Sequence, residues 1–265
     1  MPEDRPPKDR SQDRLFVQSL QKGLALLEAF GKRPGELSLN ELASLAGIDR
    51  SAAQRMAHTL LELGYLERGA HGRGYTPGRR ILDRGFDFLR SRPLLERATP
   101  VIIELQRSTG ERVDLSLFDG QTIVYALRRQ SKRETFYATL VGRRLPSFST
   151  AGGRACLAQL PRAEVEAMLP HAELRPATPK TLLDPDAIMA RIETARREGF
   201  AVAQEEMLLG EVALGAAVLD HGGRPVAAVH IAGSLAEWPA GRFAARFAPL
   251  ALEAARALGG GRGLG

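Results

Sequence analysis

Side chains that donate hydrogen bonds are concentrated in one stretch of the sequence, between residues 38 and 73. Donors of this kind recognise phosphate oxygens and the edges of bases in the major groove of DNA. The candidates for DNA contact are Ser38, Arg50, Ser51, Gln54, Arg55, His58, His71 and Arg73. Their density predicts a DNA-binding surface, and an interaction module with a solvated basic face is the alternative interpretation.

Two helices are expected to precede the main group of donors. The first is predicted over 16–30, with Ser19 as its N-cap, because leucines recur there at helical spacing. The sequence Ser38-Leu39-Asn40-Glu41 has the pattern of a capping box, in which the serine hydroxyl and the glutamate carboxylate each satisfy a backbone N–H. It predicts the start of a short second helix that ends at Gly47.

The third helix, predicted over 50–63, is the candidate recognition helix. Asp49 is its expected N-cap, and Gly64 is expected to end it in a left-handed conformation. It follows the second helix after only a turn, which is the spacing of a helix-turn-helix. The residues expected to face inward are Ala53, Met56, Ala57 and Leu60, and Ala52 is expected to face outward with the polar donors.

Two short strands, 65–68 and 75–77, are predicted to enclose a glycine-rich turn that carries His71 and Arg73. This arrangement is typical of the wing of a winged helix-turn-helix. Arginines continue beyond the turn, and we expect the whole group to lie near phosphate. The group consists of Arg68, Arg73, Arg79, Arg80, Arg84, Arg90 and Arg92.

The composition favours a two-domain protein that meets an anionic partner. A chain of 265 residues, 44% of them hydrophobic, is long enough for one sizeable core and one small core. The formal charge is +6, and the N-terminal third is the more basic part per residue. The expected division is an arm at 1–14, a winged helix-turn-helix at 15–78, a linker helix at 79–92, a larger domain at 93–258 and a tail at 259–265.

The sequence favours the cytoplasm and contains no metal or cofactor motif. A single cysteine, Cys156, excludes an internal disulfide and a cysteine-rich metal cluster. No apolar run approaches the roughly 20 residues needed to span a bilayer, and the polar N-terminus does not resemble a signal peptide. We therefore expect no membrane association and no cofactor.

An enzyme is the competing class, and its motifs are missing from the sequence. There is no nucleophile elbow, phosphate-binding loop, zinc-protease motif or dinucleotide fingerprint. Cys156 and His230 are the one pair that suggests a thiol nucleophile with a base. Cys156 falls in a predicted alanine- and leucine-rich helix, however, which favours a small buried thiol. A ligand-independent architectural DNA-binding protein is a third interpretation.

The remainder of the chain predicts an α+β domain with a mainly antiparallel sheet. Asp119-Gly120 between two apolar runs is a two-residue hairpin pattern, and Gly222-Gly223 separates two later strands. The expected strands are 113–118, 122–127, 200–204, 212–219 and 225–231. The expected helices are 79–90, 94–108, 152–169, 186–198 and 240–257.

These segments together resemble the IclR family of bacterial transcription regulators, from about Val17 to about Gly233. The N-terminal resemblance is carried by VQSLQKGLALLEAF, LSLNELASLAGIDRSAAQRMAHTLLELGYL and GRGYTPG. The C-terminal resemblance is carried by VGRRLPSFSTAGGRACLAQLP, REGFAVAQEE with Gly210 after it, and ALGAAVLDHGGRPVAAVHIAGS. The resemblance implies a winged helix-turn-helix followed by a domain that senses a small molecule.

The resemblance also implies an effector cavity where the three C-terminal motifs meet. By motif position its residues are Gly152, Gly153, Ala203, Gln204, Ala213, His230 and Ala232. Family members that bind small keto acids tend to have an acidic residue at Ala203, a cysteine at Ala213, and serines at His230 and Ala232. This chain departs at all four positions, which argues against a glyoxylate-like ligand.

The stretch VGRRLPSFSTAGGR instead resembles the subgroup that regulates catabolism of aromatic acids such as protocatechuate or 4-hydroxybenzoate. An aromatic carboxylate needs an apolar slot and one or two hydrogen-bond donors. Arg144, Arg154 and His230 are the candidate donors. Structural or surface contacts are the alternative for the two arginines, and a hydrogen-bonded core position is the alternative for His230.

The resemblance finally implies a homodimer or homotetramer on double-stranded DNA. A dimer would place two recognition helices in successive major grooves, with wings and linker arginines on phosphate. A small organic-acid effector would shift operator affinity through the relative placement of the DNA-binding pair.

Overall fold

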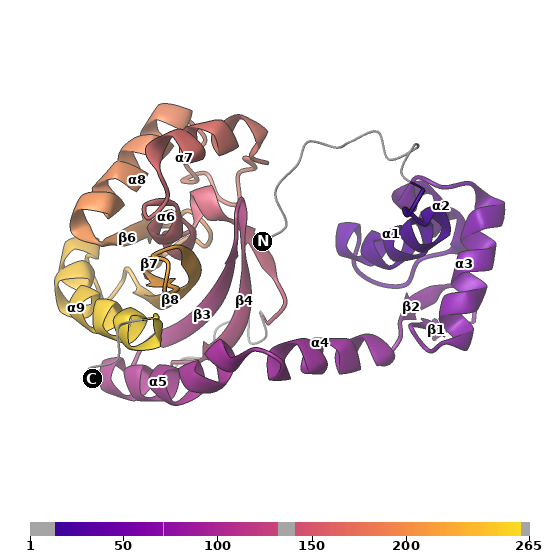
Figure 1. The fold of residues 1–265 in the computed structure, drawn as a ribbon, viewed down its shortest axis with the longest axis horizontal. Coiled ribbons are helices and arrows are strands. Elements are labelled where there is room, and N and C mark those ends of the chain that lie inside the picture. The colour runs from indigo at the N-terminus through magenta and orange to yellow at the C-terminus, as the bar shows by residue number, and fades with distance from the viewer. Residues whose placement is uncertain (1–13, 71, 132–140, 261–265) are drawn as a thin grey trace. The chain divides into compact units, whose positions relative to one another are not determined.

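The computed structural model describes residues 14–70, 72–131 and 141–260, and the chain forms two compact units, Met1–Phe88 and Leu89–Gly265 (Figure 1). In the described residues, the first unit holds three complete helices, a two-stranded hairpin and the first nine residues of a fourth helix, and the second holds a six-stranded sheet with helices. The α+β class expected from the sequence is confirmed. The finer boundaries at 15–78, 79–92 and 93–258 stay predictions.

The N-terminal unit has the element order expected of a winged helix-turn-helix. Its elements are α1 (Gln18–Lys32), α2 (Leu39–Ala46), α3 (Arg50–Glu62), β1 (Leu66–Arg68), β2 (Tyr75–Pro77) and the start of α4 (Arg80–Arg90). The two strands pair antiparallel, from Leu66 opposite Pro77 to Arg68 opposite Tyr75. Leu26, Leu37 and Leu42 are fully buried between the helices and the hairpin.

Local capping chemistry determines where two of these helices begin. The Ser38 hydroxyl accepts from the Glu41 N–H at 3.3 Å, and the Glu41 carboxylate accepts from the Ser38 N–H at 2.8 Å. The Asp49 carboxylate accepts from the Ala52 N–H at 2.8 Å, which starts α3. The capping box and the Asp49 cap are thus confirmed.

The expected start of the first helix was wrong. Ser19 lies inside α1, and the N-cap is Val17, which makes no side-chain cap hydrogen bond. The helix is held at this end by the Gln21 N–H donating to the Val17 carbonyl at 3.2 Å. Leucine spacing locates the apolar face of a helix but not its first residue, because the first turn carries no apolar repeat of its own.

The C-terminal unit is built on an antiparallel sheet with the strand order β5-β4-β3-β8-β7-β6. The strands are β3 (Arg112–Asp119), β4 (Thr122–Arg129), β5 (Arg144–Pro146), β6 (Phe200–Gln204), β7 (Glu211–Leu219) and β8 (Pro225–Ser234). Every pair among them is antiparallel in the described part of the chain. Strands from the beginning and end of the unit therefore meet in its centre, at β3 and β8.

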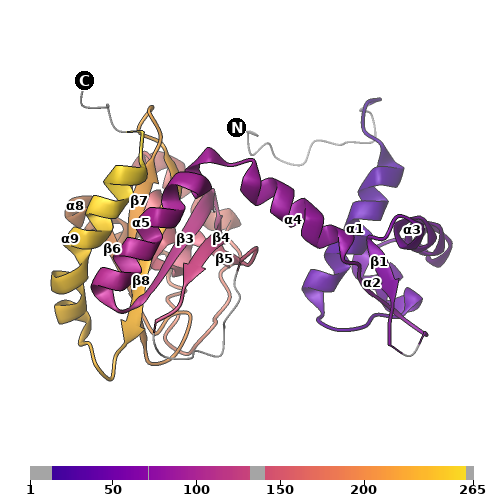
Figure 2. The same ribbon diagram turned by 90° about the horizontal axis from the view of Figure 1, so that it is seen from below.

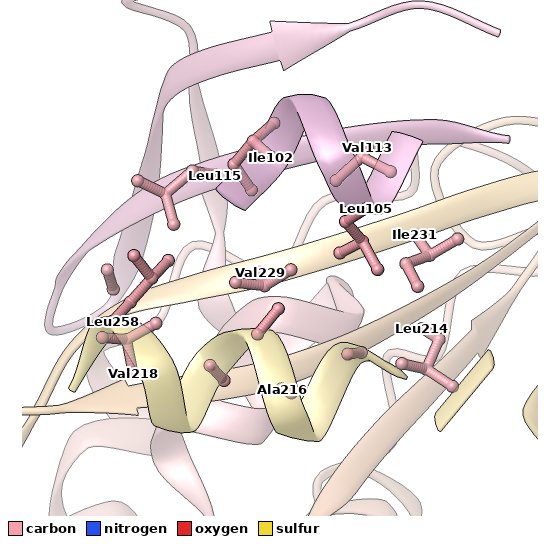
Figure 3. Close-up of a cluster of buried hydrophobic side chains, with 14 of the residues drawn as sticks. Ile102, Leu105, Val113, Leu115, Leu214, Ala216, Val218, Val229, Ile231 and Leu258 are labelled. Atoms are coloured by element: carbon pink, nitrogen blue, oxygen red, sulfur yellow. The ribbon is translucent and has the colours of Figure 1, made fainter. Parts of the chain in front are cut away.

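Two long helices cover one face of this sheet. α5 (Pro93–Thr109) and α9 (Ala240–Leu258) contact each other and the central strands (Figure 2). Alternate strand residues such as Val113, Leu115 and Val229 point toward them and are fully buried (Figure 3). Because successive side chains of a strand point to opposite faces, the residues between them face the other side of the sheet.

Three shorter helices lie on the opposite side: α6 (Ala151–Leu157), α7 (Arg162–Met168) and α8 (Pro185–Glu198). The sequence predicted one helix over 152–169, but the structure has two, with Pro161 as the N-cap of α7. Proline has no N–H to donate to the preceding turn, which disfavours it in the interior of a helix, although the two long helices α5 and α9 accommodate Pro100 and Pro249. α6 packs directly on β7 and β8.

Two details of the strands differ from the expectation. The three-residue strand β5 was not predicted, because so short an edge strand shows no alternation. The hairpin after β3 is present, but Asp119 pairs with Thr122, so its two loop residues are Gly120 and Gln121. Gly120 adopts φ 62°, the left-handed conformation that such a turn requires.

Candidate functional site

The outward face of α3 presents the expected donors of the DNA-binding surface. Gln54, Arg55 and His58 are exposed along this face. Arg50 is exposed too, with its Nε donating to the Asn40 Oδ1 at 3.0 Å. The Ser51 hydroxyl donates to the Asp49 carboxylate at 2.7 Å. The donors are therefore held on one surface, and their contacts with DNA stay predictions.

Two residues expected on this surface, Ala52 and Ser38, are at least partly buried. Ala52 was expected to face outward, but it is 2% exposed, because its small side chain lies in the first turn of α3 next to the buried Ala53. Ser38 is half-buried, and its hydroxyl also donates to the Glu41 carboxylate at 2.8 Å. These contacts make Ser38 a cap of α2 in this structure.

The wing places Arg73 beside the start of α2. Arg73 is exposed and lines a shallow groove together with Ser38 and two acids, Glu36 and Glu41. His71 lies outside the described residues. The glycines at the wing leave room for the Glu36 side chain, since a Cβ at Gly69 would lie 1.9 Å from the Glu36 Cδ.

Several arginines of the basic stretch have partners within the chain. The Arg79 Nε lies 3.0 Å from the Glu67 carboxylate, and the Arg84 Nη2 lies 3.0 Å from the Asp87 carboxylate. The Arg68 guanidinium stacks on the Tyr75 ring, 4.7 Å from its centroid. The Arg80 Nη1 donates to the Leu63 carbonyl at 2.8 Å. The stretch is thus also part of the wing's own framework.

Arg55→Ala is expected to weaken operator binding at least about fivefold, because a lost base or phosphate contact costs about 1 kcal/mol or more. Fluorescence anisotropy at several salt concentrations checks this. A phosphate contact would flatten the salt dependence by about one unit, whereas a base contact would relax sequence preference. Arg175→Ala, on an exposed arginine of the C-terminal unit, is the control. Equal affinity of the two variants would contradict the prediction.

The C-terminal unit contains a small cavity on the side of the sheet opposite α5 and α9. Its volume is about 30 Å³, which is room for about two water molecules. Its walls come from β3, β4, β6, β7, β8, the start of α6 and the segment between β6 and β7. The sequence placed the effector cavity by motif position, and four of those positions, Ala203, Ala213, His230 and Ala232, line this cavity.

Strand register gives the cavity an apolar floor. Ala203 on β6 lies opposite Ala213 on β7, and Ala213 lies opposite Ala232 on β8. Ala232 in turn lies opposite Arg112 on β3. The three alanines therefore form a continuous row across three strands, which we call the alanine floor, with Arg112 at its end. Their methyl groups offer a surface without hydrogen-bonding atoms.

A chain of charged groups borders this floor. The Asp114 carboxylate accepts two hydrogen bonds from Arg128, from Nε at 2.6 Å and from Nη2 at 2.8 Å. The Arg112 Nε donates to Asp114 at 3.2 Å, and its Nη1 donates to Glu211 at 2.7 Å. Burial lowers the pKa of Arg112, but the carboxylates of Glu211 and Asp114 outweigh it and raise that pKa, so the guanidinium stays charged. The charges are thus paired within the wall.

His230 is both a hydrogen-bonded core residue and a residue of the cavity wall. Its side chain is buried, its Nε2 lies 2.7 Å from the Ser116 hydroxyl, and its ring lies 5.4 Å from the Tyr125 ring. Burial lowers the pKa of His230 to about 4, with Asp114 opposing the shift. The imidazole is therefore neutral at pH 7. It can donate or accept a hydrogen bond, but it carries no positive charge that would attract an anion.

This buried histidine should make the C-terminal unit less stable in mild acid. Its pKa is about 6.5 in the unfolded chain, so between pH 6.5 and 4 only the unfolded state takes up the proton. The contribution of His230 to the free energy of unfolding should fall by about 2 kcal/mol between pH 7 and pH 5. Urea unfolding followed by the fluorescence of Trp238, the one tryptophan of the chain, measures it. Between pH 7 and pH 5, the unfolding free energy of His230→Gln should fall by about 2 kcal/mol less than that of the wild type. An equal fall in both proteins would contradict the prediction.

Five residues expected at the cavity lie elsewhere. Gln204 is exposed, because the alternation of β6 turns it away from Ala203. Arg144 is more than half exposed and pairs with Asp119 and with the Thr122 hydroxyl. Gly152 and Gly153 do not line the cavity. Gly152 allows α6 to approach the sheet closely, since a Cβ there would lie 2.1 Å from the His230 Cε1, and Gly153 allows close approach to the Ser147 backbone.

Arg154 is the fifth of these residues, and it makes structural contacts within the chain, which was the alternative to a ligand contact. It is fully buried behind the cavity wall, where it forms a double ion pair with Glu206, one contact being 2.7 Å from Nη2. Its Nε donates to the Phe148 carbonyl at 2.7 Å. Its side chain thus ties α6 to the β6–β7 segment through Glu206 and to the turn Ser147–Ser149 through Phe148.

The thiol–imidazole pair considered for an enzyme is not formed. The Cys156 Sγ donates to the Ala227 carbonyl at 3.2 Å, while His230 bonds to Ser116. Burial raises the pKa of the Cys156 thiol far above its usual range. Cys156 is therefore a buried structural thiol, as the alanine- and leucine-rich context suggested.

Sequence reasoning missed the charged residues of the wall, namely Arg112, Asp114, Glu205, Glu206 and Glu211. The alternation in the β3 sequence RVDLSLFD could have indicated that Arg112, Asp114 and Ser116 share one face. Within the described residues no group of histidine, cysteine and acidic side chains is arranged to hold a metal ion. No described helix is both long and apolar enough to cross a membrane.

Comparisons with known proteins agree with both units. Residues 19–70 match the family described as the IclR helix-turn-helix domain, and residues 86–259 match the bacterial transcriptional regulator IclR C-terminal family. The Pca regulon regulatory protein of Pseudomonas putida is 30% identical over 244 residues, which cover 92% of this chain and 83% of that protein.

Two solved structures have the same fold. A putative transcriptional regulator from Rhodococcus sp. RHA1 is 30% identical, with a TM-score of 0.77 over 92% of this chain and 97% of that one. An IclR homolog from Microbacterium hydrocarbonoxydans, solved in complex with 4-hydroxybenzoate, is 21% identical, with a TM-score of 0.73 over 91% of this chain and 97% of that one. The second shows likeness of fold alone.

Proposed function

Because the chain belongs to the IclR family of DNA-binding transcription regulators, we propose that a small organic acid bound in its cavity changes its affinity for operator DNA. The observation that carries this proposal is the alanine floor with Arg112 at its end. An apolar surface suits an aromatic ring, and a guanidinium suits a carboxylate.

An aromatic acid such as protocatechuate or 4-hydroxybenzoate is the proposed effector. The Pca regulon relative and the homologue solved with 4-hydroxybenzoate support this choice. The alanines also support it, since Ala203, Ala213 and Ala232 offer no hydrogen bonds to the polar atoms of a small keto acid. The cavity of about 30 Å³ must widen to admit a ring, so binding and movement of the wall are expected to be coupled.

A cytoplasmic homodimer or homotetramer is the proposed active form on double-stranded DNA. Apolar side chains on the described helices support self-association: Leu82 on α4 is 76% exposed and Leu20 on α1 is 61% exposed. Two recognition helices in one dimer would reach successive major grooves. Effector binding would then change operator affinity by a coupling free energy of typically about 1–3 kcal/mol.

The proposal is tested by fluorescence anisotropy of the full chain on DNA from its own upstream region and on scrambled DNA, at fixed near-physiological salt. Each titration is run without ligand, with protocatechuate and with 4-hydroxybenzoate. Selective binding that one acid shifts supports the proposal. Selective binding that neither acid shifts rejects the effector class, and binding without selectivity favours the architectural alternative.

His230→Ala is expected to weaken the response to the effector without harming DNA binding. The ring forms part of the cavity wall, and its loss removes both the hydrogen bond to Ser116 and the contact with Tyr125. The dose–response curve of operator binding measures the change, with folding verified by Trp238 fluorescence. His221→Ala, an exposed histidine of the same unit, is the control. An unchanged curve in a folded His230→Ala protein would sink the prediction.

A further inference from the structure

The cavity wall carries more acids than bases. Among the described residues that line it, Arg112 is the one permanent cation, and the imidazole of His230 is neutral. Four carboxylates line the same space: Asp114, Glu205, Glu206 and Glu211. An acid that enters therefore meets a single cation that already has anionic partners.

The two partners of Arg112 are held very differently. Asp114 is fixed by the two hydrogen bonds from Arg128 in addition to the one from Arg112, and it is 1% exposed. For the Glu211 carboxylate, the described structure shows one partner, the Arg112 Nη1 at 2.7 Å. Its side chain is 16% exposed, so water can solvate it with little movement. Glu211 is thus the more easily displaced of the two.

A carboxylate on the alanine floor would meet Glu211 at the same guanidinium. Arg112 is the neighbour of Ala232 in the row, and Glu211 reaches it from the first position of β7. Two carboxylates at one donor edge repel each other, and that repulsion grows in a partly buried site. Simple addition of an acid is therefore unfavourable, whereas an exchange conserves the ion pair.

We propose that the effector's carboxylate replaces the Glu211 carboxylate on Arg112, so that Glu211 is a built-in competitor for the ligand. This inference rests on the proposed function, in which the effector is an organic acid. One ion pair is broken and one is formed, and the released Glu211 carboxylate turns toward solvent. Arg112 is the anchor, and Asp114 with Arg128 holds the anchor in place.

The exchange acts on the segment that closes the cavity. Residues 205–208 line the space and lead directly into Glu211. The Glu205 N–H donates to the Glu211 carbonyl at 2.8 Å, and the Glu205 carboxylate accepts from the Gly210 N–H at 3.0 Å. Glu205 also holds φ 57°, a left-handed conformation unfavourable for a residue other than glycine. Release of Glu211 therefore loosens a strained segment at the place where a ring needs room.

The test compares 4-hydroxybenzoate and 4-hydroxybenzamide, its uncharged analogue, as calorimetric ligands of the full chain. Glu211→Gln should bind 4-hydroxybenzoate at least tenfold more tightly than the wild type, because the competing charge is gone and the shape is kept. The gain should be absent for 4-hydroxybenzamide. Glu205→Gln, which neutralises another acid of the wall, is the matched control and should show no tenfold gain. Arg112→Gln should lose 4-hydroxybenzoate binding.

The outcomes separate this inference from the function on which it rests. If the wild type binds 4-hydroxybenzoate and Glu211→Gln binds it equally or more weakly, the exchange is overturned while the effector class stands. If Glu205→Gln gains as much affinity for 4-hydroxybenzoate as Glu211→Gln, the gain comes from the lower negative charge of the wall in general, and the exchange is overturned. If no protein binds 4-hydroxybenzoate, protocatechuate or benzoate, the organic-acid function falls and the exchange falls with it. Glu211→Ala replaces Glu211→Gln if the latter fails to fold.

Discussion

Glu206→Gln is expected to lower the free energy of unfolding of the C-terminal unit by about 3–5 kcal/mol. The Arg154 and Glu206 side chains are 1% and 6% exposed, and the substitution leaves the Arg154 charge buried without its counter-charge. Glu206 also accepts a hydrogen bond from the Leu182 N–H at 3.2 Å, and glutamine has one acceptor oxygen in place of two to serve Leu182 and both Arg154 nitrogens. Urea unfolding followed by Trp238 fluorescence measures the change in this unit alone.

The same measurement on two further proteins separates charge from shape. Glu166→Gln makes the identical change in an exposed pair with Arg162 and should alter stability little. The double variant Arg154→Met with Glu206→Leu removes both charges and should regain most of the loss, since a buried pair is often replaced by apolar groups without penalty. A single variant as stable as the wild type would show that the pair is dispensable.

Gly153→Ala is expected to destabilise the C-terminal unit by roughly 3 kcal/mol or more, through overpacking against backbone that has little room to move. A Cβ at this position would lie 2.3 Å from both the Cα and the carbonyl oxygen of Ser147. Those are backbone atoms, so a rotamer change cannot relieve the clash. Because α6 would have to move away from the turn Ser147–Ser149, the cavity wall formed by Thr150 and Ala151 should shift and ligand binding should weaken too.

Gly241→Ala provides the matched control for this substitution. Gly241 lies in the first turn of α9, and a Cβ there meets nothing within 4 Å. Alanine favours the helix more than glycine, so this variant should be as stable as the wild type or slightly more stable. Both variants are compared by the urea midpoint of Trp238 fluorescence. The packing explanation fails if Gly153→Ala and Gly241→Ala unfold at the same midpoint.

Most of the fold could be predicted from the sequence, because its determinants are local. The cap at Asp49, the turn at Gly120 and the left-handed Gly64 after α3 each depend on a few neighbouring residues. The strands β3 and β4, and likewise β7 and β8, are largely apolar runs joined by a turn that contains glycine, so their positions were also predicted well. The errors at Ser19 and β5 occur where a helix end or a strand has no local pattern of its own. The errors at 152–169 and Ala52 occur where the apolar pattern continues past the end of a helix or past the edge of its buried face.

The site was predicted less completely, because it depends on register between distant segments. Resemblance placed Ala203, Ala213, His230 and Ala232 at a cavity, and they line it. Nothing local indicates that the three alanines stand opposite one another, or that Arg112 meets Glu211 across 99 positions of sequence. Of the two arginines that the sequence suggested, Arg154 is buried in contacts with Phe148 and Glu206, and Arg144 pairs with Asp119 in an exposed position.

The alternation of the strands assigns neighbouring residues to different tasks. Val113 and Leu115 pack under α5 while Arg112 and Asp114, one position away, face the cavity. Mutational drift at the cavity-facing positions can therefore proceed without disturbing the core layer. A library restricted to the alanine floor would explore new ligand preferences on an intact scaffold, which makes this sheet a natural starting point for engineered biosensors.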